Sequence, residues 1–370
     1  MWGNVRGGMA HFQERRGTPA KHPVRQFFHG LSLPFHLLRA LWGDPVARRR
    51  YLRVGLVQCL VILALAFAFK SWEDKGVGVA EQHGARVETT KGKHGRIQFR
   101  WKADGNDEDD EPADEPDGDE ATVAAPPAPA QGLVVRELAF WAALFAAAHM
   151  AQWVVIALSR DFHDTISRDA SLLTGLEPED EDVAPRIRLD LKWVRRKISR
   201  RFRAFMVFTV GVPVLYCLSI PLPYRHALAS VLISAWSAYW VVVFTTAQSG
   251  HAWRNSEAGP PWFLRGWSWL TTRVPGFRWG VPRAYGRFWE NQTRPLFPPA
   301  TEMEKQPWAF AGLALTGMLS MIPLVKCFLR PLMPVASAHL LVARHTAERA
   351  AASASEASAS PAANSSANAA

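Results

Sequence analysis

Five long apolar runs constrain the fold of this chain more than any other feature. They cover residues 54–69, 133–158, 204–220, 227–247 and 308–325. A helix needs about 20 apolar residues to cross the hydrocarbon layer of a bilayer, so each run is close to spanning length. The mean hydropathy of −0.07 is low because very polar segments separate the runs. The sequence therefore predicts an all-α polytopic membrane protein with about four transmembrane helices.

The last apolar run differs from the others because prolines and cations interrupt it. Within residues 308–342 these are Pro323, Lys326, Arg330, Pro331 and Pro334. Proline removes a backbone donor and breaks a helix, and a cation at the centre of a spanning helix costs roughly 2.5–3.5 kcal/mol. Two interpretations remain open. Either residues 308–325 span and the cations emerge on the far side, or residues 308–342 fold back as a re-entrant hairpin.

The re-entrant interpretation has two consequences. Non-helical backbone at membrane depth survives only where protein or a water-filled cavity surrounds it, so the turn would border a cavity. Gly312 and Gly317 would thin the first limb of the hairpin and let another helix pack closely against it.

A shorter amphipathic segment precedes the first apolar run. From Gln26 to Trp42, apolar side chains recur every three or four positions, which is typical of a helix with one apolar face. The segment is too short to span, so we expect it to lie in the interface plane or to dip partway into the membrane. Arg48, Arg49 and Arg50 follow it, at the start of the first span.

The polar segments divide the chain into regions. We expect a basic tail at 1–25, a helical membrane domain at 26–343, an inserted loop at 71–131 and an alanine- and serine-rich tail at 344–370. Both tails and the acidic second part of the loop are predicted to be disordered, since such compositions cannot bury enough apolar surface to fold. The first part of the loop alternates around a Lys-Gly-Lys-His-Gly turn and predicts a small β-hairpin.

The distribution of lysine and arginine predicts the orientation. The region before the first run, residues 159–203 and residues 249–307 carry 10, 11 and 8 of them, whereas the turn at 221–226 carries 1. Short cytoplasmic loops are enriched in these residues. We therefore expect the N-terminus and the two basic segments in the cytoplasm, and the acidic loop and the 221–226 turn outside.

Residues 249–307 place six tryptophans among arginines. An indole suits the headgroup layer because it has one polar and one apolar side. Aromatic and arginine side chains together also bind single-stranded nucleic acid. The apolar runs on both sides favour membrane lipids as the partner, and no nucleic acid is expected.

The chemistry of an enzyme is not visible in the sequence. We find no phosphate-cradling glycine loop, metal-ligand cluster or nucleophile with an oriented base, so no catalytic residue, metal or cofactor is expected. Ionisable groups at membrane depth are the better functional candidates, because they are costly there and usually face a cavity. His149, Lys326 and Arg330 are such groups. The alternative for His149 is a hydrogen bond between helices, and for the two cations a positive anchor at the membrane surface.

Three stretches resemble the CysZ sulfate-permease family, whose domain the etoposide-induced membrane proteins share. They are FFHGLSLPFHLLRALWGDPVARRRYLR, DFHDTISRDASLLTGLEP and GLALTGMLSMIPLVKCFLRPLMPVASAHLL, in that order along the chain. The resemblance implies four full spans and two half-membrane helical hairpins, at residues 26–50 and 308–343. It also implies an inner-membrane location.

The same resemblance implies a permease or channel-like protein for a small inorganic anion such as sulfate. The arginine pair that the family offers to sulfate falls on Arg48 and Arg49, while Lys326 stands where the family usually has asparagine. With Arg330, these residues are the anion-binding candidates. The alternative is a membrane scaffold that transports nothing, and the sequence allows a homo-oligomer in either case.

Overall fold

The computed structural model describes residues 22–82, 87–91, 97–101, 133–180, 182, 184–187, 191–221, 223–254 and 258–359. These residues form two compact units. One comprises Met1–Cys59 with Val155–Ala370, and the other comprises Leu60–Val154. The acidic part of the inserted loop and most of the basic tail lie outside the described residues, so their predicted disorder stays a prediction.

Every secondary-structure element of the larger unit is a helix among the described residues. Its first elements are α2 (Pro23–Gly43), the start of α3 (Pro45–Gln82), the end of α4 (Leu133–Leu158), α5 (Arg160–Leu173), α6 (Leu191–Ser219) and α7 (Arg225–Thr246). Its later elements are η1 (Gly250–Trp253), α8 (Trp262–Arg273), η2 (Pro275–Phe277), α9 (Gly280–Thr293), η3 (Arg294–Leu296), α10 (Phe297–Lys305), α11 (Pro307–Leu319), α12 (Pro323–Leu329) and α13 (Leu332–Ala359).

The smaller unit holds the rest of α3 and α4 and a two-stranded antiparallel hairpin. The strands are β1 (Val87–Lys91) and β2 (Ile97–Trp101), with Val87 opposite Trp101. The β-hairpin predicted from the alternating pattern is therefore present. Helix α3 continues to Gln82, past the point at which the sequence predicted the loop to begin.

Four helices are long and apolar enough to cross a membrane, by length and composition. Within the described residues they are Pro45–Phe69, Phe140–Leu158, Val194–Ser219 and Arg225–Thr246. These helices coincide with the first four apolar runs of the sequence. The predicted fold class, an all-α polytopic membrane protein, is confirmed, with the small β-hairpin as an addition.

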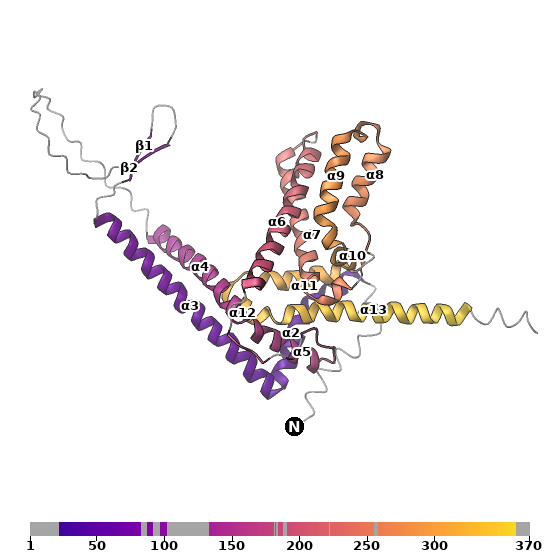
Figure 1. Cartoon of the computed structure of the whole chain (residues 1–370), viewed down its shortest axis with the longest axis horizontal. Helices are drawn as coiled ribbons and strands as arrows, with labels where there is room; N and C mark the ends of the chain where they lie inside the picture. The colour runs from indigo at the N-terminus through magenta and orange to yellow at the C-terminus, as the bar shows by residue number, and fades with distance from the viewer. Residues whose placement is uncertain are drawn as a thin grey trace, which may run out of the picture. The chain divides into compact units, whose positions relative to one another are not determined.

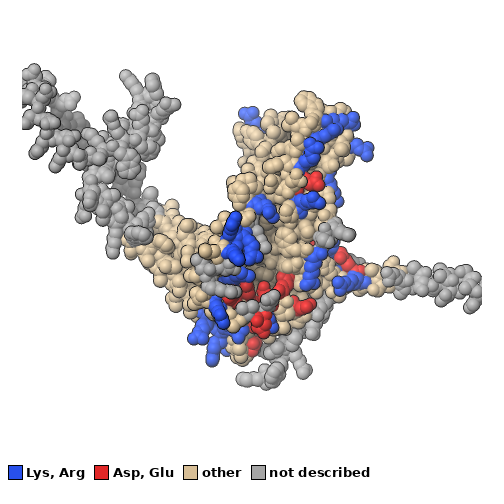
Figure 2. Space-filling view, in the orientation of Figure 1, with Lys and Arg blue, Asp and Glu red and all other residues tan. Residues whose placement is uncertain are grey.

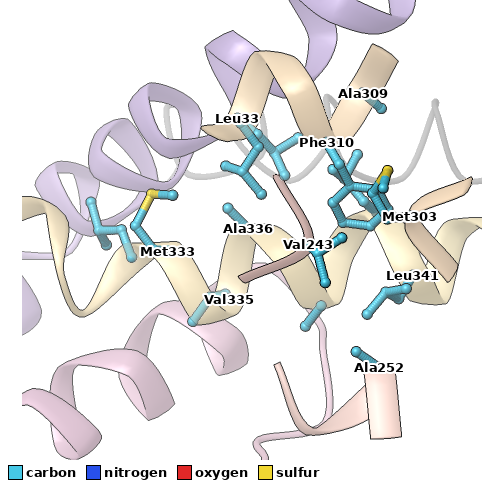
Figure 3. Close-up of a cluster of buried hydrophobic side chains, with 14 of the residues drawn as sticks. Leu33, Val243, Ala252, Met303, Ala309, Phe310, Met333, Val335, Ala336 and Leu341 are labelled. Atoms are coloured by element: carbon cyan, nitrogen blue, oxygen red, sulfur yellow. The ribbon is translucent and has the colours of Figure 1, made fainter. Parts of the chain in front are cut away.

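The core of the larger unit is built around α11. This helix packs against α2, α7 and α13, and Figure 3 shows Phe310 of α11 among side chains from the neighbouring elements, including Leu33, Val243 and Leu341. The closest approach is between α11 and α2. A Cβ atom on Gly30 would lie 1.8 Å from the Ala309 carbonyl oxygen, and one on Gly312 would lie 2.0 Å from the Phe27 carbonyl oxygen.

Helices α6 and α7 pack together, α8 packs on α9, and α9 packs on α6, so the four stand side by side (Figure 1). An aromatic cluster joins α7, α8 and α9. Its members are Trp236, Tyr239, Trp240, Phe263, Trp267, Tyr285 and Trp289. Trp289 is buried, whereas Trp262, Trp269 and Trp279 are exposed. The expectation that the tryptophans of residues 249–307 lie in the headgroup layer therefore does not hold for Trp289, because its ring fills the core of this helical block.

Helix α13 extends further than the sequence predicts. Disorder was expected from residue 344, but α13 continues to Ala359. The sequence ERAAASASEASA supplies many alanines, and alanine has the highest intrinsic helix propensity. These residues can therefore continue α13 without an apolar face, because tertiary contacts already hold the earlier part of the helix.

Candidate functional site

The closing stretch forms a helical hairpin with a broken turn. Helix α11 ends at Leu319, α12 begins at Pro323, and α13 is bent by 48° from α12. Helices α11 and α13 pack against each other and lie side by side in Figure 1. The 13 residues of α11 extend about 20 Å, which is less than the hydrocarbon thickness of about 30 Å. Residues 308–325 therefore do not form one continuous spanning helix.

The three prolines of this stretch mark its breaks. Pro323 is the first residue of α12, Pro331 directly precedes α13, and Pro334 lies in the first turn of α13. The first N–H groups of a helix have no partner within it, so proline at these positions removes no helical hydrogen bond. The same residues prevent α12 from continuing the helix that precedes it or merging straight into α13.

A buried ion pair joins the two ends of the hairpin. Arg344 Nη1 lies 2.8 Å from Glu302 Oε2, and the two residues are 5% and 1% exposed. Burial alone would raise the pKa of Glu302, but Arg344, Lys305 and His345 around its carboxylate lower it overall. Glu302 therefore stays ionised. The ion pair therefore holds the beginning and the end of the hairpin close together.

Side chains from α3 and α5 bind the backbone of the broken turn. Tyr51 Oη donates to the Phe328 carbonyl at 3.1 Å, and Cys59 Sγ donates to the Leu324 carbonyl at 3.7 Å. From α5, Ser167 Oγ donates to the Pro331 carbonyl at 2.7 Å. Carbonyls near a helix break need such outside partners. As a result, α12 lies alongside the first part of α3.

A buried polar pair adjoins this turn. The amide of Gln58 donates to Ser159 Oγ at 2.8 Å and faces His163 Nε2 at 3.1 Å. Ser159 Oγ gives its own hydrogen to the Val155 carbonyl, so it accepts from Gln58. His163 Nε2 accepts the second amide hydrogen, which places the imidazole proton on Nδ1.

Two atoms of this pair lack partners. Gln58 and His163 are 4% and 3% exposed, yet Gln58 Oε1 and His163 Nδ1 have no hydrogen-bond partner in the described part of the chain. Buried polar atoms are normally satisfied, and a buried acceptor and donor left open suit a water molecule or a small polar ligand. We call Gln58 and His163 the buried polar pair.

Arg330 supplies the charge next to the buried polar pair. Burial lowers the pKa of His163 well below its usual range, and the positive charge of Arg330 lowers it further, so the imidazole is neutral. Arg330 also acts on Asp164, whose pKa is raised by burial in spite of Arg160 and Arg330. Asp164 is ion-paired with Arg160 at 3.3 Å. Figure 2 shows acidic and basic side chains gathered together in the lower middle of this face.

The anion-binding candidates fall into two groups. Lys326 and Arg330 lie in the broken turn, and both are partly exposed. Arg48 and Arg49 are exposed on the first turn of α3, and no hydrogen bond or ion pair within the described residues engages either side chain. Their neighbour Arg50 is ion-paired with Asp169 at 2.8 Å. The structure thus places Lys326 and Arg330, but not Arg48 and Arg49, at the broken turn.

His149, the remaining candidate, lies in α4 within the smaller unit, where its ring stacks on Phe145. Sequence reasoning missed Gln58, a polar residue inside the first apolar run, and gave no role to His163. A buried amide in an apolar run is a signal that could have identified Gln58, because such a group needs a partner.

The fold and the broken turn define the class of protein as a multi-pass α-helical membrane protein with a polar, cationic break in its last hairpin. Comparison with family models, with curated proteins and with solved structures finds no match.

Proposed function

We propose that this protein conducts a small inorganic anion, such as sulfate, across the inner membrane. The observation that carries the proposal is the broken turn, in which Arg330 stands next to the buried polar pair. The expected neutral tautomer of His163 offers an N–H donor from Nδ1. A cation with nearby neutral donors attracts an anion and replaces part of its hydration shell.

The position of α12 along α3 supports a site within the membrane. Cys59, which contacts Leu324, lies five residues past Val54, where the first apolar run begins. At a rise of 1.5 Å per residue this is about 8 Å along the helix. If α3 crosses the bilayer over Pro45–Phe69, the turn enters from the end of α3 that carries Arg48. The cations of the turn would then border a protein-lined cavity, because lipid would be unfavourable for both.

Anion flux into liposomes tests the proposal. Purified protein should give anion-dependent flux above that of empty liposomes. Arg330→Gln should reduce this flux at least about tenfold, because it removes one desolvated contact between the anion and a cation, and such a contact is worth roughly 1.5–3 kcal/mol. Lys326→Gln should reduce it as well. Arg349→Gln is the matched control, because Arg349 is exposed on α13 beyond the hairpin and carries the same charge.

Two results would contradict the proposal. One is flux no greater than that of empty liposomes over a panel of anions, which would favour a scaffold that transports nothing. The other is unchanged flux in both Arg330→Gln and Lys326→Gln, which would remove the broken turn from the path.

A further inference from the structure

The hairpin of α8 and α9 has two different faces. Its inner face carries Phe263, Tyr285 and Trp289, which pack on α6 and α7 through Trp236 and a hydrogen bond from Tyr285 to the Val210 carbonyl. Both α6 and α7 belong to the candidate membrane spans. The hairpin therefore packs against two helices that are long and apolar enough to cross a membrane.

The outer face combines arginine with large aromatic side chains and has no acid. Between Trp262 and Trp289 the sequence contains five arginines and no aspartate or glutamate. All five arginines are exposed, and Trp269 and Trp279 are 60% and 70% exposed. Figure 2 shows basic side chains along this part of the molecule, at the upper right of the view, separated by uncharged ones.

Within the described part of the chain, the side chains of three of these arginines form no ion pair or hydrogen bond. Arg265 is ion-paired with Glu304, and Arg278 donates to the carbonyls that end α8. The guanidinium groups of Arg273, Arg283 and Arg287 have no ion-pair or hydrogen-bond partner among the residues that the structure describes. Their guanidinium groups are available to an outside anion. We call Arg273, Arg283 and Arg287 the free arginines.

We propose that the outer face of the α8–α9 hairpin binds the anionic headgroups of phospholipids. Guanidinium groups bind phosphate with two parallel hydrogen bonds, and indoles prefer the layer between headgroups and acyl chains. A basic surface gains about a fivefold preference for an anionic bilayer with each arginine near it. Hydrocarbon would not suit this face, because the free arginines would be desolvated without a counter-charge.

The test is thermal unfolding of the detergent-purified full chain in the presence of phosphatidylglycerol, phosphatidylcholine or inorganic phosphate. Phosphatidylglycerol should raise the Tm, and the other two should not. In the triple variant Arg273→Gln, Arg283→Gln and Arg287→Gln, the lipid concentration at half effect should rise at least about tenfold. The matched control is Arg186→Gln, Arg254→Gln and Arg349→Gln, which removes three exposed positive charges elsewhere and should change that concentration less than about twofold.

A second triple variant, Arg273→Lys, Arg283→Lys and Arg287→Lys, separates the loss of charge from misfolding. It retains the positive charges and should therefore retain most of the lipid effect. The proposal is overturned if the glutamine variant of the free arginines responds to phosphatidylglycerol as the native protein does. It is also overturned if this variant and the matched control variant lose the response equally. It is also overturned if inorganic phosphate alone raises the Tm as much as the lipid, since the face would then be a site for the free ion.

Discussion

At the scale of single residues, the segment after α5 brings together two carboxyl groups with opposite pKa shifts. Partial burial raises the pKa of Asp180 to about 6, and the charges of Asp164 and Glu179 add to this effect. Burial acts in the same direction on Glu179, but hydrogen bonds from His251, Ser249 and Gly250 outweigh it and lower the pKa to about 2. Glu179 is thus ionised throughout the physiological range, while Asp180 gains a proton slightly below neutrality.

The raised pKa of Asp180 predicts a pH-dependent effect of Asp180→Asn. The folded pKa of about 6 lies above the ordinary value of 3.8, so ionised Asp180 destabilises the fold, and this loss develops as the pH rises from about 4 through 6. Asp180→Asn should therefore raise the Tm at pH 7.5 and leave it unchanged near pH 4. Thermal unfolding at both pH values checks this. An equal gain at both pH values would show that the carboxylate charge is not the cause.

The residues of the broken turn show what the sequence could and could not reveal at this scale. Pro323, Lys326 and Arg330 were identifiable because each violates the composition of an apolar run. His163 was not, because its role depends on Gln58, which is 105 residues away in the sequence. Local patterns carry no information about such a pair.

At the scale of helices, the contact of α2 with α11 depends on the absence of side chains at two positions. The backbones approach so closely at Gly30 and Gly312 that a methyl group would overlap a carbonyl oxygen of the other helix. Thr316 Oγ1 adds a hydrogen bond to the Leu31 carbonyl at 2.9 Å. Small residues allow this type of packing in membrane helices, where close van der Waals contact replaces the hydrophobic effect.

This contact predicts opposite outcomes for two glycine-to-alanine substitutions. Gly312→Ala should destabilise the protein by about 1–3 kcal/mol, because α2 and α11 must move apart. Gly266→Ala, in the interior of α8 with no atom within 4 Å of the added methyl group, should stabilise it by up to about 1 kcal/mol through helix propensity. The unfolding midpoints of the two purified variants measure the difference. A neutral or stabilising Gly312→Ala would contradict the observed packing.

The four helices long enough to span followed from the sequence, since apolar runs are local signals, whereas α5, α8, α9 and α10 were not predicted as helices. The bounds of α7, Arg225–Thr246, are close to the apolar run at 227–247. The packing of α8 and α9 on α6 was not foreseen. This packing depends on contacts between residues far apart in the sequence, such as Tyr285 and Val210. The tryptophans of residues 249–307 divide between buried and exposed positions, which the sequence alone does not distinguish.

At the scale of the whole molecule, contacts link the three basic segments that the sequence predicts on one side of the membrane. Arg50, at the start of α3, is paired with Asp169 of α5. Glu179, in the segment that follows α5, accepts hydrogen bonds from Ser249 and from the backbone of Gly250 and His251. All of these residues lie outside the apolar runs of the sequence, and segments that touch there share one side of a bilayer. These contacts agree with the prediction that the three basic segments lie on one side.

The central proposal is that the closing stretch enters and leaves the membrane on the same side. Glu302 and Arg344, at the two ends of the hairpin, are joined by the 2.8 Å ion pair. A single crossing by residues 308–325 would instead separate these ends by the thickness of the bilayer, which is about 30 Å for the hydrocarbon alone.

Labelling with a membrane-impermeant maleimide tests this claim most directly. The background is a chain in which Cys59, Cys217 and Cys327 are replaced by serine. Two variants of it, Arg294→Cys and Thr346→Cys, each place one cysteine at an exposed position, before and after the hairpin. A third variant, Asn106→Cys in the acidic loop, provides the reference for the opposite side. We predict that the cysteines at 294 and 346 react from the same side and the cysteine at 106 from the other. Reaction of the cysteines at 294 and 346 from opposite sides would contradict the hairpin.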